Sequence, residues 1–446
     1  MENNSNQYET RSSNKIMVKG AITGALILLM LIPTVFIMSL VQEREQRQKE
    51  VVAEVSNKWA KAQTITGPYI IVPYNEVVTN TDNKKATVRK SVVLLPENLH
   101  VNGNVTAQQS HRSIYKVLLY KSNLTAKGNF YIKLPTAIIP ENLLLNEAQL
   151  CVGLSDFKGI EGKITVNFNG ASYDLNTGLP SDEIDSIGLS AAVPLSADNF
   201  KKDIPFTFAL NIKGSEQLSF VPLAANSQFS LQSAWPNPSF NGNTLPSERI
   251  VSEKGFNAKW NFNKANLPYN TASKGFNIEK SSYSFGVTML QPADQYAKTM
   301  RSVKYAILFI GLTFSLFFIV ELMQKKPVHP VQYVLVGLAL VIFYSLLLSI
   351  SEYILFDYAY LIAAVATVTL IALYAKSHFI SWKIASVFGG VLTALYTFIF
   401  VLISLEDTAL LVGSIGLFAV LALVMYASRK IKWYHPSLPN AEVKAV

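Results

Sequence analysis

Six long apolar runs, each carrying at most one charge, constrain the fold of this chain more than any other feature. Each run has about 20 residues, which is the length that a helix needs to cross ~30 Å of hydrocarbon. Because a bilayer offers no water to unpaired backbone groups, such runs must cross it as helices. The sequence therefore predicts an integral membrane protein with six transmembrane α-helices, arranged 1 + 5: Ala21–Leu40, Tyr305–Met323, Val331–Ile350, Ile354–Tyr374, Ile384–Leu405 and Thr408–Tyr426.

A cleaved signal peptide is the alternative interpretation of the first run. Its hydrophobic region would be shorter, and a cleavage site made of small residues would follow it. The stretch that spans the end of the run, IMSLVQERE, contains no such site. We therefore expect an uncleaved membrane anchor.

Basic residues alternate from one loop to the next. The short loops around Glu352 and Glu406 contain no Lys or Arg. Since Lys and Arg of short loops mark the cytoplasmic side, we expect both termini in the cytoplasm and residues 42–304 outside it. The basic residues that support this orientation are Arg11, Lys15, Lys19, Lys325, Lys326, Lys376, Lys383, Arg429, Lys430 and Lys432.

Residues 42–304 are expected to contain a β-rich domain. Apolar and polar residues alternate along several segments, which is typical of strands with one buried face. Asn169-Gly170 and Asn102-Gly103 are candidate hairpin turns. We therefore predict a β-rich antiparallel sandwich or a long meander, with the clearest strands at Ile164–Phe168, Phe206–Ile212, Phe256–Phe262 and Tyr283–Met289.

These patterns divide the chain into six segments. Val41–Ala60 is charged and lacks Gly and Pro, so we expect it to continue the first span as a stalk helix. The predicted segments are a cytoplasmic tail (1–20), a transmembrane helix (21–41), a juxtamembrane stalk helix (42–61), an outer β-rich domain (62–298), a five-helix transmembrane bundle (299–427) and a second cytoplasmic tail (428–446).

The motifs of common enzymes and metal sites are incomplete here. Gly162-Lys163 lacks the upstream glycine of a phosphate-binding loop, and the five histidines are scattered. Ser155 and Ser190 lack the closing glycine of a nucleophile elbow, so we interpret them as ordinary turn or strand residues. Cys151, the only cysteine, lies in an apolar strand, where we expect a buried thiol. We therefore predict that the protein is not an enzyme and binds no cofactor or metal.

Glu321 and Asp357 are the charged residues within the predicted spans. Both lie near a span end, where we expect interfacial water to solvate them. An ion-coupled transporter would need a charge nearer the midplane. The pairs Gly20–Gly24 and Gly390–Ala394 have the spacing of helix-packing motifs, and we expect them to contact other helices.

The segment Trp235–Arg249 is rich in proline and aromatic residues. Its two large aromatic side chains either cap the core of the sheet or form a surface that binds protein or lipid. We expect an ordered loop in which Trp235 is buried and Phe240 lies at the surface.

Lys298, Arg301 and Lys304 share one face of a helix just before the second span. We expect them to reach the outer lipid head groups, and a specific lipid or partner site is the alternative. The net charge of +9 fits anionic lipid. Because no basic run alternates with aromatic residues, we expect no nucleic-acid binding.

Several long stretches resemble the CreD family of bacterial inner-membrane, cell-envelope-integrity proteins. The stretches are GPYIIVPY, VGLSDFKGI, WPNPSFNGNTLP, GFNAKW, QPADQYAKTMRSVKYAILFI and HPVQYVLVGLALVIFYSLLLSISE. Ser113 and Lys158 depart from the pattern, since the family favours Gly and Arg there. The resemblance covers the chain from Ala21 to Trp433 and supplies no catalytic residues.

The resemblance implies a Gram-negative inner membrane with the β-rich domain in the periplasm. It also implies a role in envelope integrity, tolerance to colicins and control by a two-component sensor and regulator. The leading hypothesis is therefore a non-enzymatic protein whose periplasmic domain binds lipid or an envelope partner. The alternatives are a transporter or lipid-handling protein and, with little support from the motifs, a membrane-anchored hydrolase.

Overall fold

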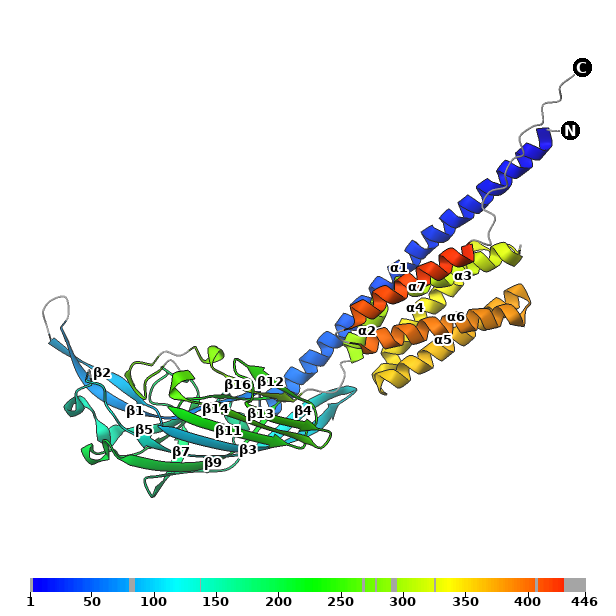
Figure 1. Cartoon of the computed structure of the whole chain (residues 1–446). Coiled ribbons are helices and arrows are strands. Elements are labelled where there is room, and N and C mark those ends of the chain that lie inside the picture. The colour runs from blue at the N-terminus through cyan, green and yellow to red at the C-terminus, as the bar shows by residue number, and fades with distance from the viewer. Residues whose placement is uncertain are drawn as a thin grey trace, which may run out of the picture. The chain divides into compact units, whose positions relative to one another are not determined.

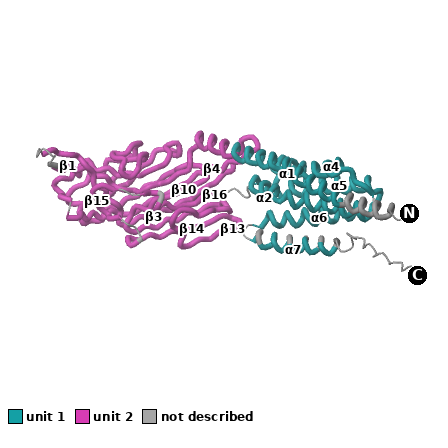
Figure 2. The backbone as a smooth tube through the Cα atoms, turned by 90° about the horizontal axis from the view of Figure 1, so that it is seen from above, with its two compact units in different colours: residues 1–47, 293–446 teal, residues 48–292 magenta. Residues whose placement is uncertain are grey.

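The computed structural model describes residues 3–79, 85–136, 138–266, 269–276, 279–289, 295–324, 326–405 and 408–428. The chain divides into two compact units (Figure 2). Met1–Arg47 and Ala293–Val446 form the membrane unit, and Gln48–Pro292 form the β unit. The first boundary falls inside the longest helix, so that helix contributes residues to both units.

The membrane unit is helical. Five of its helices, α1 and α3 to α6, have the length and hydropathy of a membrane span, and α7 covers the sixth apolar run. The predicted membrane protein, with one apolar helix before a β-rich domain and five after it, is confirmed. The helices, labelled in Figure 1, are α1 (Asn3–Trp59), α2 (Gln295–Lys304), α3 (Ala306–Gln324), α4 (Pro330–Ser351), α5 (Phe356–Phe379), α6 (Trp382–Ser404) and α7 (Ala409–Ser428).

Aromatic side chains pack the membrane helices against one another. The ring of Tyr396 in α6 lies 4.4 Å from that of Phe309 in α3 and 4.8 Å from that of Phe343 in α4. The Tyr360 hydroxyl in α5 donates a hydrogen bond of 2.8 Å to the Tyr396 carbonyl. Helices in hydrocarbon associate through such packing and interhelical hydrogen bonds, so this cluster joins four of them.

α1 and α4 approach each other closely at Gly337, which is not one of the predicted glycines. A Cβ atom added at Gly24 or Gly390 would meet no described atom within 4 Å. The prediction is therefore wrong for Gly24 and Gly390, whereas an added Cβ at Gly20 would lie 3.8 Å from the Phe318 ring of α3, which is an ordinary contact between helices. At Gly337 of α4 an added Cβ would lie 2.6 Å from Cγ of Met30 in α1. Spacing marks small residues on a helix but does not decide which of them faces a neighbour.

The β unit contains sixteen described strands. Their bounds are β1 (Gln63–Thr79), β2 (Lys85–Leu94), β3 (Asn98–Arg112), β4 (Tyr115–Tyr131), β5 (Gln149–Gly153), β6 (Ile164–Phe168), β7 (Ala171–Thr177), β8 (Gly188–Ala192), β9 (Asp203–Ser215), β10 (Gln217–Val221), β11 (Asn226–Ser233), β12 (Pro238–Gly242), β13 (Glu248–Ser252), β14 (Gly255–Phe262), β15 (Ala272–Lys274) and β16 (Phe285–Met289).

The strands pair in the order β12-β16-β10-β1-β5-β8-β7-β6-β9-β4-β3-β11-β14-β13, and β2 pairs with β1 and β15. Described neighbours are antiparallel except for two pairs, β1 with β10 and β3 with β11, which are parallel. The prediction of a β-rich, mostly antiparallel domain is thus confirmed, and the two parallel pairs add to it. The parallel pairs arise where a strand pairs with one distant in sequence, which local alternation does not reveal.

The core of the β unit lies between two layers of strands. Phe206, Phe208, Leu210 and Ile212 of β9 are buried as the alternation predicted. The ring of Phe285 in β16 lies 4.9 Å from that of Phe229, 5.3 Å from that of Trp260 and 4.8 Å from that of Phe262. Phe229 belongs to β11, and the other two belong to β14. Phe285 therefore joins the two layers at one end of the core.

The two predicted hairpin turns have opposite outcomes. Asn169 and Gly170 have φ angles of 51° and 84° and join β6 to β7, which confirms that turn. Asn102-Gly103 is not a turn, because β3 continues through it. An added Cβ at Gly103 would lie within 2.6 Å of the Leu231 and Leu124 side chains, so this glycine allows dense packing. The turn that joins β3 to β4 contains Ser113, and its φ of 57° is a conformation that favours glycine.

The last turns of α1 pack on the β unit. Arg112 and Glu54 form an ion pair of 2.9 Å, and Lys158 Nζ donates a 2.7 Å hydrogen bond to the Asn57 carbonyl. Lys213 Nζ lies 4.7 Å from the centre of the Trp59 ring. The helix therefore ends on the domain that follows it, in the charged segment that we expected to form a stalk.

Removal of the Phe285 ring tests the core of the β unit. Phe285→Ala is expected to lower the free energy of unfolding by about 3–5 kcal/mol, because the surrounding rings cannot fill the space. Ile250→Ala is the matched control, since Ile250 is 72% exposed on β13. Denaturant titration of the full chain in lipid nanodiscs, followed by tryptophan fluorescence, measures both. Equal losses for the two variants would contradict the proposed core.

Candidate functional site

The segment Trp235–Arg249 is part of the sheet framework and not a projecting loop. It includes β12 and the beginning of β13. Trp235 and Phe240 are both partly buried against the core, so the predicted contrast between a buried Trp235 and a surface Phe240 is wrong. Pairing of β12 with β16 holds the Phe240 ring 5.8 Å from that of Phe256 and 5.9 Å from that of Trp260.

The same segment connects the two ends of the strand order. β12 is the first strand of that order and β13 is the last. Between them, the Thr244 carbonyl accepts a 3.2 Å hydrogen bond from Trp260 Nε1. Asn241 Nδ2 donates a 2.6 Å hydrogen bond to Thr288 Oγ1. The segment thus fastens one layer to the other, which is a structural role that its aromatic composition did not reveal.

The three predicted basic residues lie in α2, away from its buried face. Tyr296, Thr299, Ser302 and Val303 form that buried face. Lys298 lies 3.7 Å from Asp357 and 5.3 Å from the centre of the Phe356 ring. Arg301 and Lys304 are exposed. The trio therefore divides into one residue that contacts α5 and two that face outward.

Glu352 lies in the loop between α4 and α5 and contacts two other helices. Its Oε1 accepts a 3.3 Å hydrogen bond from the Tyr296 hydroxyl of α2 and lies 3.9 Å from Arg44 Nε of α1. The acidic loop that guided the orientation of the spans thus lies at the same end of the membrane unit as residue 44 and α2.

Glu321 is buried at the end of α3, and its carboxylate is fully engaged. Lys19 Nζ of α1 pairs with Oε1. The Val328 backbone N–H donates to the same oxygen at 3.0 Å, and the Tyr333 hydroxyl donates to Oε2 at 3.1 Å. The expectation that water solvates Glu321 is therefore wrong, although Asp357 is exposed as expected. Folding of α1 against α3 and α4 excludes water from this carboxylate.

A cleft in the β unit contains the site that sequence reasoning missed. Its volume is about 370 Å³. Asp185, buried in its wall, pairs through Oδ1 with Lys280 Nζ and accepts a 3.2 Å hydrogen bond on Oδ2 from the Tyr69 hydroxyl. The lining residues are Thr64, Thr66, Leu154, Ser155, Asp185, Ser186, Ile187, Lys280 and Ser284.

Distant parts of the chain position Asp185. Tyr69 lies in β1 and Cys151 in β5, where the two residues pair across the strands. Gly153, at the end of β5, leaves room for the carboxylate, because an added Cβ would lie 2.1 Å from Asp185 Oδ2. Two of the stretches that carry the family resemblance, GPYIIVPY and VGLSDFKGI, therefore meet at this carboxylate.

The surroundings of Asp185 keep its neighbours protonated. Burial raises the pKa of the Tyr69 hydroxyl, and the charge of Asp185 raises it further. Burial, followed by the same charge, raises the pKa of the Cys151 thiol. Cys151 is fully buried, which confirms that prediction. A neutral thiol is a poor nucleophile, so Tyr69 acts as a hydrogen-bond donor and Cys151 as a packing residue.

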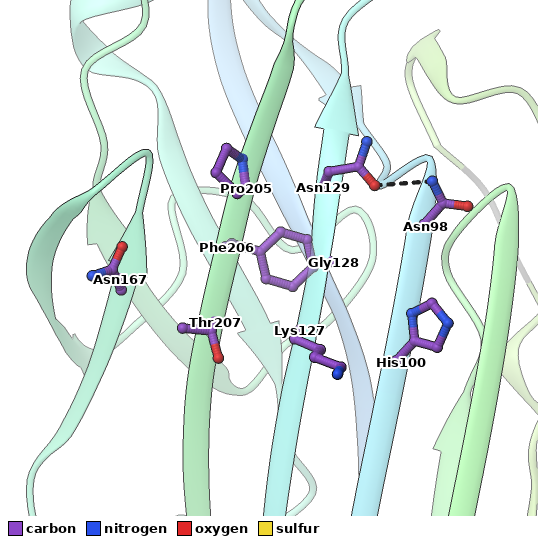
Figure 3. Close-up of a pocket in the computed structure, with 9 residues that line it drawn as sticks. All are labelled: Asn98, His100, Lys127, Gly128, Asn129, Asn167, Pro205, Phe206 and Thr207. Atoms are coloured by element: carbon purple, nitrogen blue, oxygen red, sulfur yellow. Dashed lines mark hydrogen bonds between the residues drawn. The ribbon is translucent and has the colours of Figure 1, made fainter.

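A second, shallower depression lies on the outward face of β3, β4 and β9 (Figure 3). Asn98 Nδ2 donates a 2.9 Å hydrogen bond to Asn129 Oδ1, and Asn129 Nδ2 donates one of 2.5 Å to Asp203. His100 and Lys127 are exposed beside them. Because His100 and Lys127 are open to water and the two asparagines already hydrogen bond to each other, the depression resembles ordinary sheet surface more than a binding site.

Among the described residues, no three His, Cys, Asp or Glu side chains are placed to hold a metal ion. At the cleft, Ser155 Oγ accepts a 3.0 Å hydrogen bond from the backbone N–H of Thr64. The arrangement offers a held ion pair and several hydroxyls, which are groups suited to binding polar molecules.

Comparison with known proteins covers both units. Residues 15–434 match the family model described as "Inner membrane protein CreD". The chain is 34% identical over 420 residues to the protein of Escherichia coli (strain K12) named Inner membrane protein CreD, and the match covers 93% of each chain. The similarity therefore extends over the membrane helices and the β unit together.

The Glu321 cluster makes a stability prediction for the membrane unit. Glu321→Gln is expected to lower the free energy of unfolding by about 1.5–3 kcal/mol, because hydrogen bonds to a charged group are lost. Asp357→Asn is the matched control and is expected to cost about 0–1 kcal/mol, because its ion pair is exposed. Thermal unfolding in nanodiscs measures both. An Asp357 variant as unstable as the Glu321 variant would refute the distinction.

Proposed function

The chain belongs to the CreD family of inner membrane proteins, and from that membership we propose that it supports the integrity of the bacterial cell envelope without catalysing a reaction. Its β unit binds a lipid or an envelope partner. The observation that carries the proposal is the insertion of a β unit with its own large core between α1 and α2. A domain of that size, continuous with the spans at both ends, presents a folded surface beside the membrane.

The proposed orientation places both termini in the cytoplasm and residues 42–304 in the periplasm. The alternation of basic and acidic loops supports it. The contact of Arg44 and Tyr296 with Glu352 also supports it, because these residues border the β unit and belong to the acidic side. Lys19, just before the apolar part of α1, pairs with Glu321 near the end of α3, which is consistent with both residues lying on the cytoplasmic side.

The lipid bilayer is the first proposed partner. The exposed Arg301 and Lys304 of α2 suit anionic lipid head groups. Lys298 takes part less, because Asp357 and Phe356 already engage it. The ligand of the β unit is a separate partner.

Reporter fusions test the orientation. A reporter that is active only in the periplasm is expected to work when fused after Phe200 and to fail when fused after Trp433, because the rule for basic loops places these residues on opposite sides. A cytoplasmic reporter serves as the control and is expected to give the reverse pattern. Periplasmic activity after Trp433 would contradict the orientation.

A deletion strain tests the envelope role. Cells that lack the protein are expected to take up more of a hydrophobic fluorescent dye and to survive detergent less well. The unsubstituted chain restores both properties. The variant Arg301→Gln/Lys304→Gln is expected to restore them incompletely, because each basic residue near anionic lipid contributes about 1 kcal/mol of attraction. Lys163→Gln is the control, since Lys163 forms an exposed ion pair with Asp174 in the β unit. Normal dye exclusion in the deletion strain would reject the proposed role.

A further inference from the structure

The cleft at Asp185 has the size and chemistry of a small-molecule site. Its volume of about 370 Å³ lies in the range of ~300–1,000 Å³ that ligand pockets occupy. It is formed by residues of β1, by the segments that follow β5 and precede β8, and by Lys280 and Ser284. Four separate parts of the chain thus converge on one concave surface.

The charges of the cleft balance each other. The Asp185 side chain is 6% exposed, and the Lys280 side chain is 33% exposed. A ligand therefore meets the ammonium group directly, with the carboxylate just behind it. Asp185 offsets the attraction of Lys280 for a bare anion, and Lys280 offsets the attraction of Asp185 for a bare cation, so neither ion is strongly favoured. The pair consequently favours a ligand that is neutral overall and accepts hydrogen bonds.

Hydroxyl groups supply the rest of the polar lining. They belong to Thr64, Thr66, Ser155, Ser186 and Ser284, and each hydroxyl can donate one hydrogen bond and accept others. Ser155 Oγ already accepts the Thr64 N–H, so its own hydrogen remains to donate. Leu154 and Ile187 add apolar contact beside these groups. Alternating donors and acceptors beside small apolar patches complement the hydroxyls and C–H faces of a sugar.

We propose that this cleft binds a neutral saccharide, a single sugar unit or a disaccharide, through Lys280, Asp185 and the surrounding hydroxyls. Lys280 donates to sugar oxygens, and Asp185 holds the ammonium group in place with the help of Tyr69. The inference deepens the proposed function, because it names the ligand class of the β unit, and it rests on that function for its relevance in the cell.

Saccharide binding is measured on the full chain in nanodiscs of phosphatidylethanolamine and phosphatidylglycerol, without glycosidic detergents, which would compete. The probes are N-acetylglucosamine, maltose and inorganic phosphate, and saturation-transfer NMR reports binding. At least one sugar is expected to bind saturably. Lys280→Met is expected to raise the dissociation constant at least about tenfold, the effect of losing ~1.4 kcal/mol. Lys163→Met is the matched control and is expected to change nothing.

A second variant keeps the test decisive if Lys280→Met disturbs folding. Ser186 is exposed at the cleft, so Ser186→Phe is expected to fill the space and abolish sugar binding while the protein keeps its melting temperature. The proposal is overturned if neither sugar binds, if phosphate binds in their place, or if a folded Ser186→Phe variant binds sugar normally.

The same variants separate this inference from the envelope role. If Ser186→Phe loses sugar binding but restores dye exclusion in the deletion strain, the saccharide site stands and its link to envelope integrity fails. If sugar binding is never observed while the deletion strain leaks dye, the envelope role stands and the saccharide site fails.

Discussion

Hydrocarbon cannot hydrogen bond to a polypeptide backbone, and the architecture of the membrane unit follows from that constraint. Each apolar run must form a helix, and charges survive only where a partner engages them. Two such charged residues of α1, Lys19 and Arg44, flank its apolar part, Ala21–Leu40. Lys19 pairs with buried Glu321, and Arg44 lies beside Glu352. Both contacts join α1 to residues far along the chain, since Glu321 lies 302 positions after Lys19. The aromatic cluster around Tyr396 then packs the remaining helices.

The β unit is stabilised differently. Each of its layers has one face toward water and the other face toward the opposite layer. Phe285 joins the layers from within. The Trp235–Arg249 segment joins them at the ends of the strand order. There, Phe240 packs on Trp260, and the Thr244 carbonyl accepts a hydrogen bond from the indole N–H of Trp260. The fold therefore explains the prolines and aromatic residues of this segment, and we do not propose it as a docking loop.

The proposed functions involve two places in this framework. We propose that the exposed Arg301 and Lys304 of α2 contact anionic lipid head groups. The Asp185 cleft has a neutral pair of charges and a ring of hydroxyls, which suits a sugar. The two proposals concern different components of an envelope, the lipid bilayer and a polar molecule.

The sequence by itself determined the number and type of the spans, the basic loops, the β-rich class, the Asn169-Gly170 turn and the burial of Cys151, because each depends on neighbouring residues alone. Only the tertiary structure decided the burial of Glu321, the place of Phe240 and the role of Gly103. The same holds for the Asp185 site, whose tyrosine and lysine partners lie 116 and 95 residues away. Local sequence patterns indicate which face of a strand or helix is apolar, but they do not indicate which distant segment packs on that face. The packing of such a distant segment excludes water from a carboxylate and provides its hydrogen-bond and charge partners.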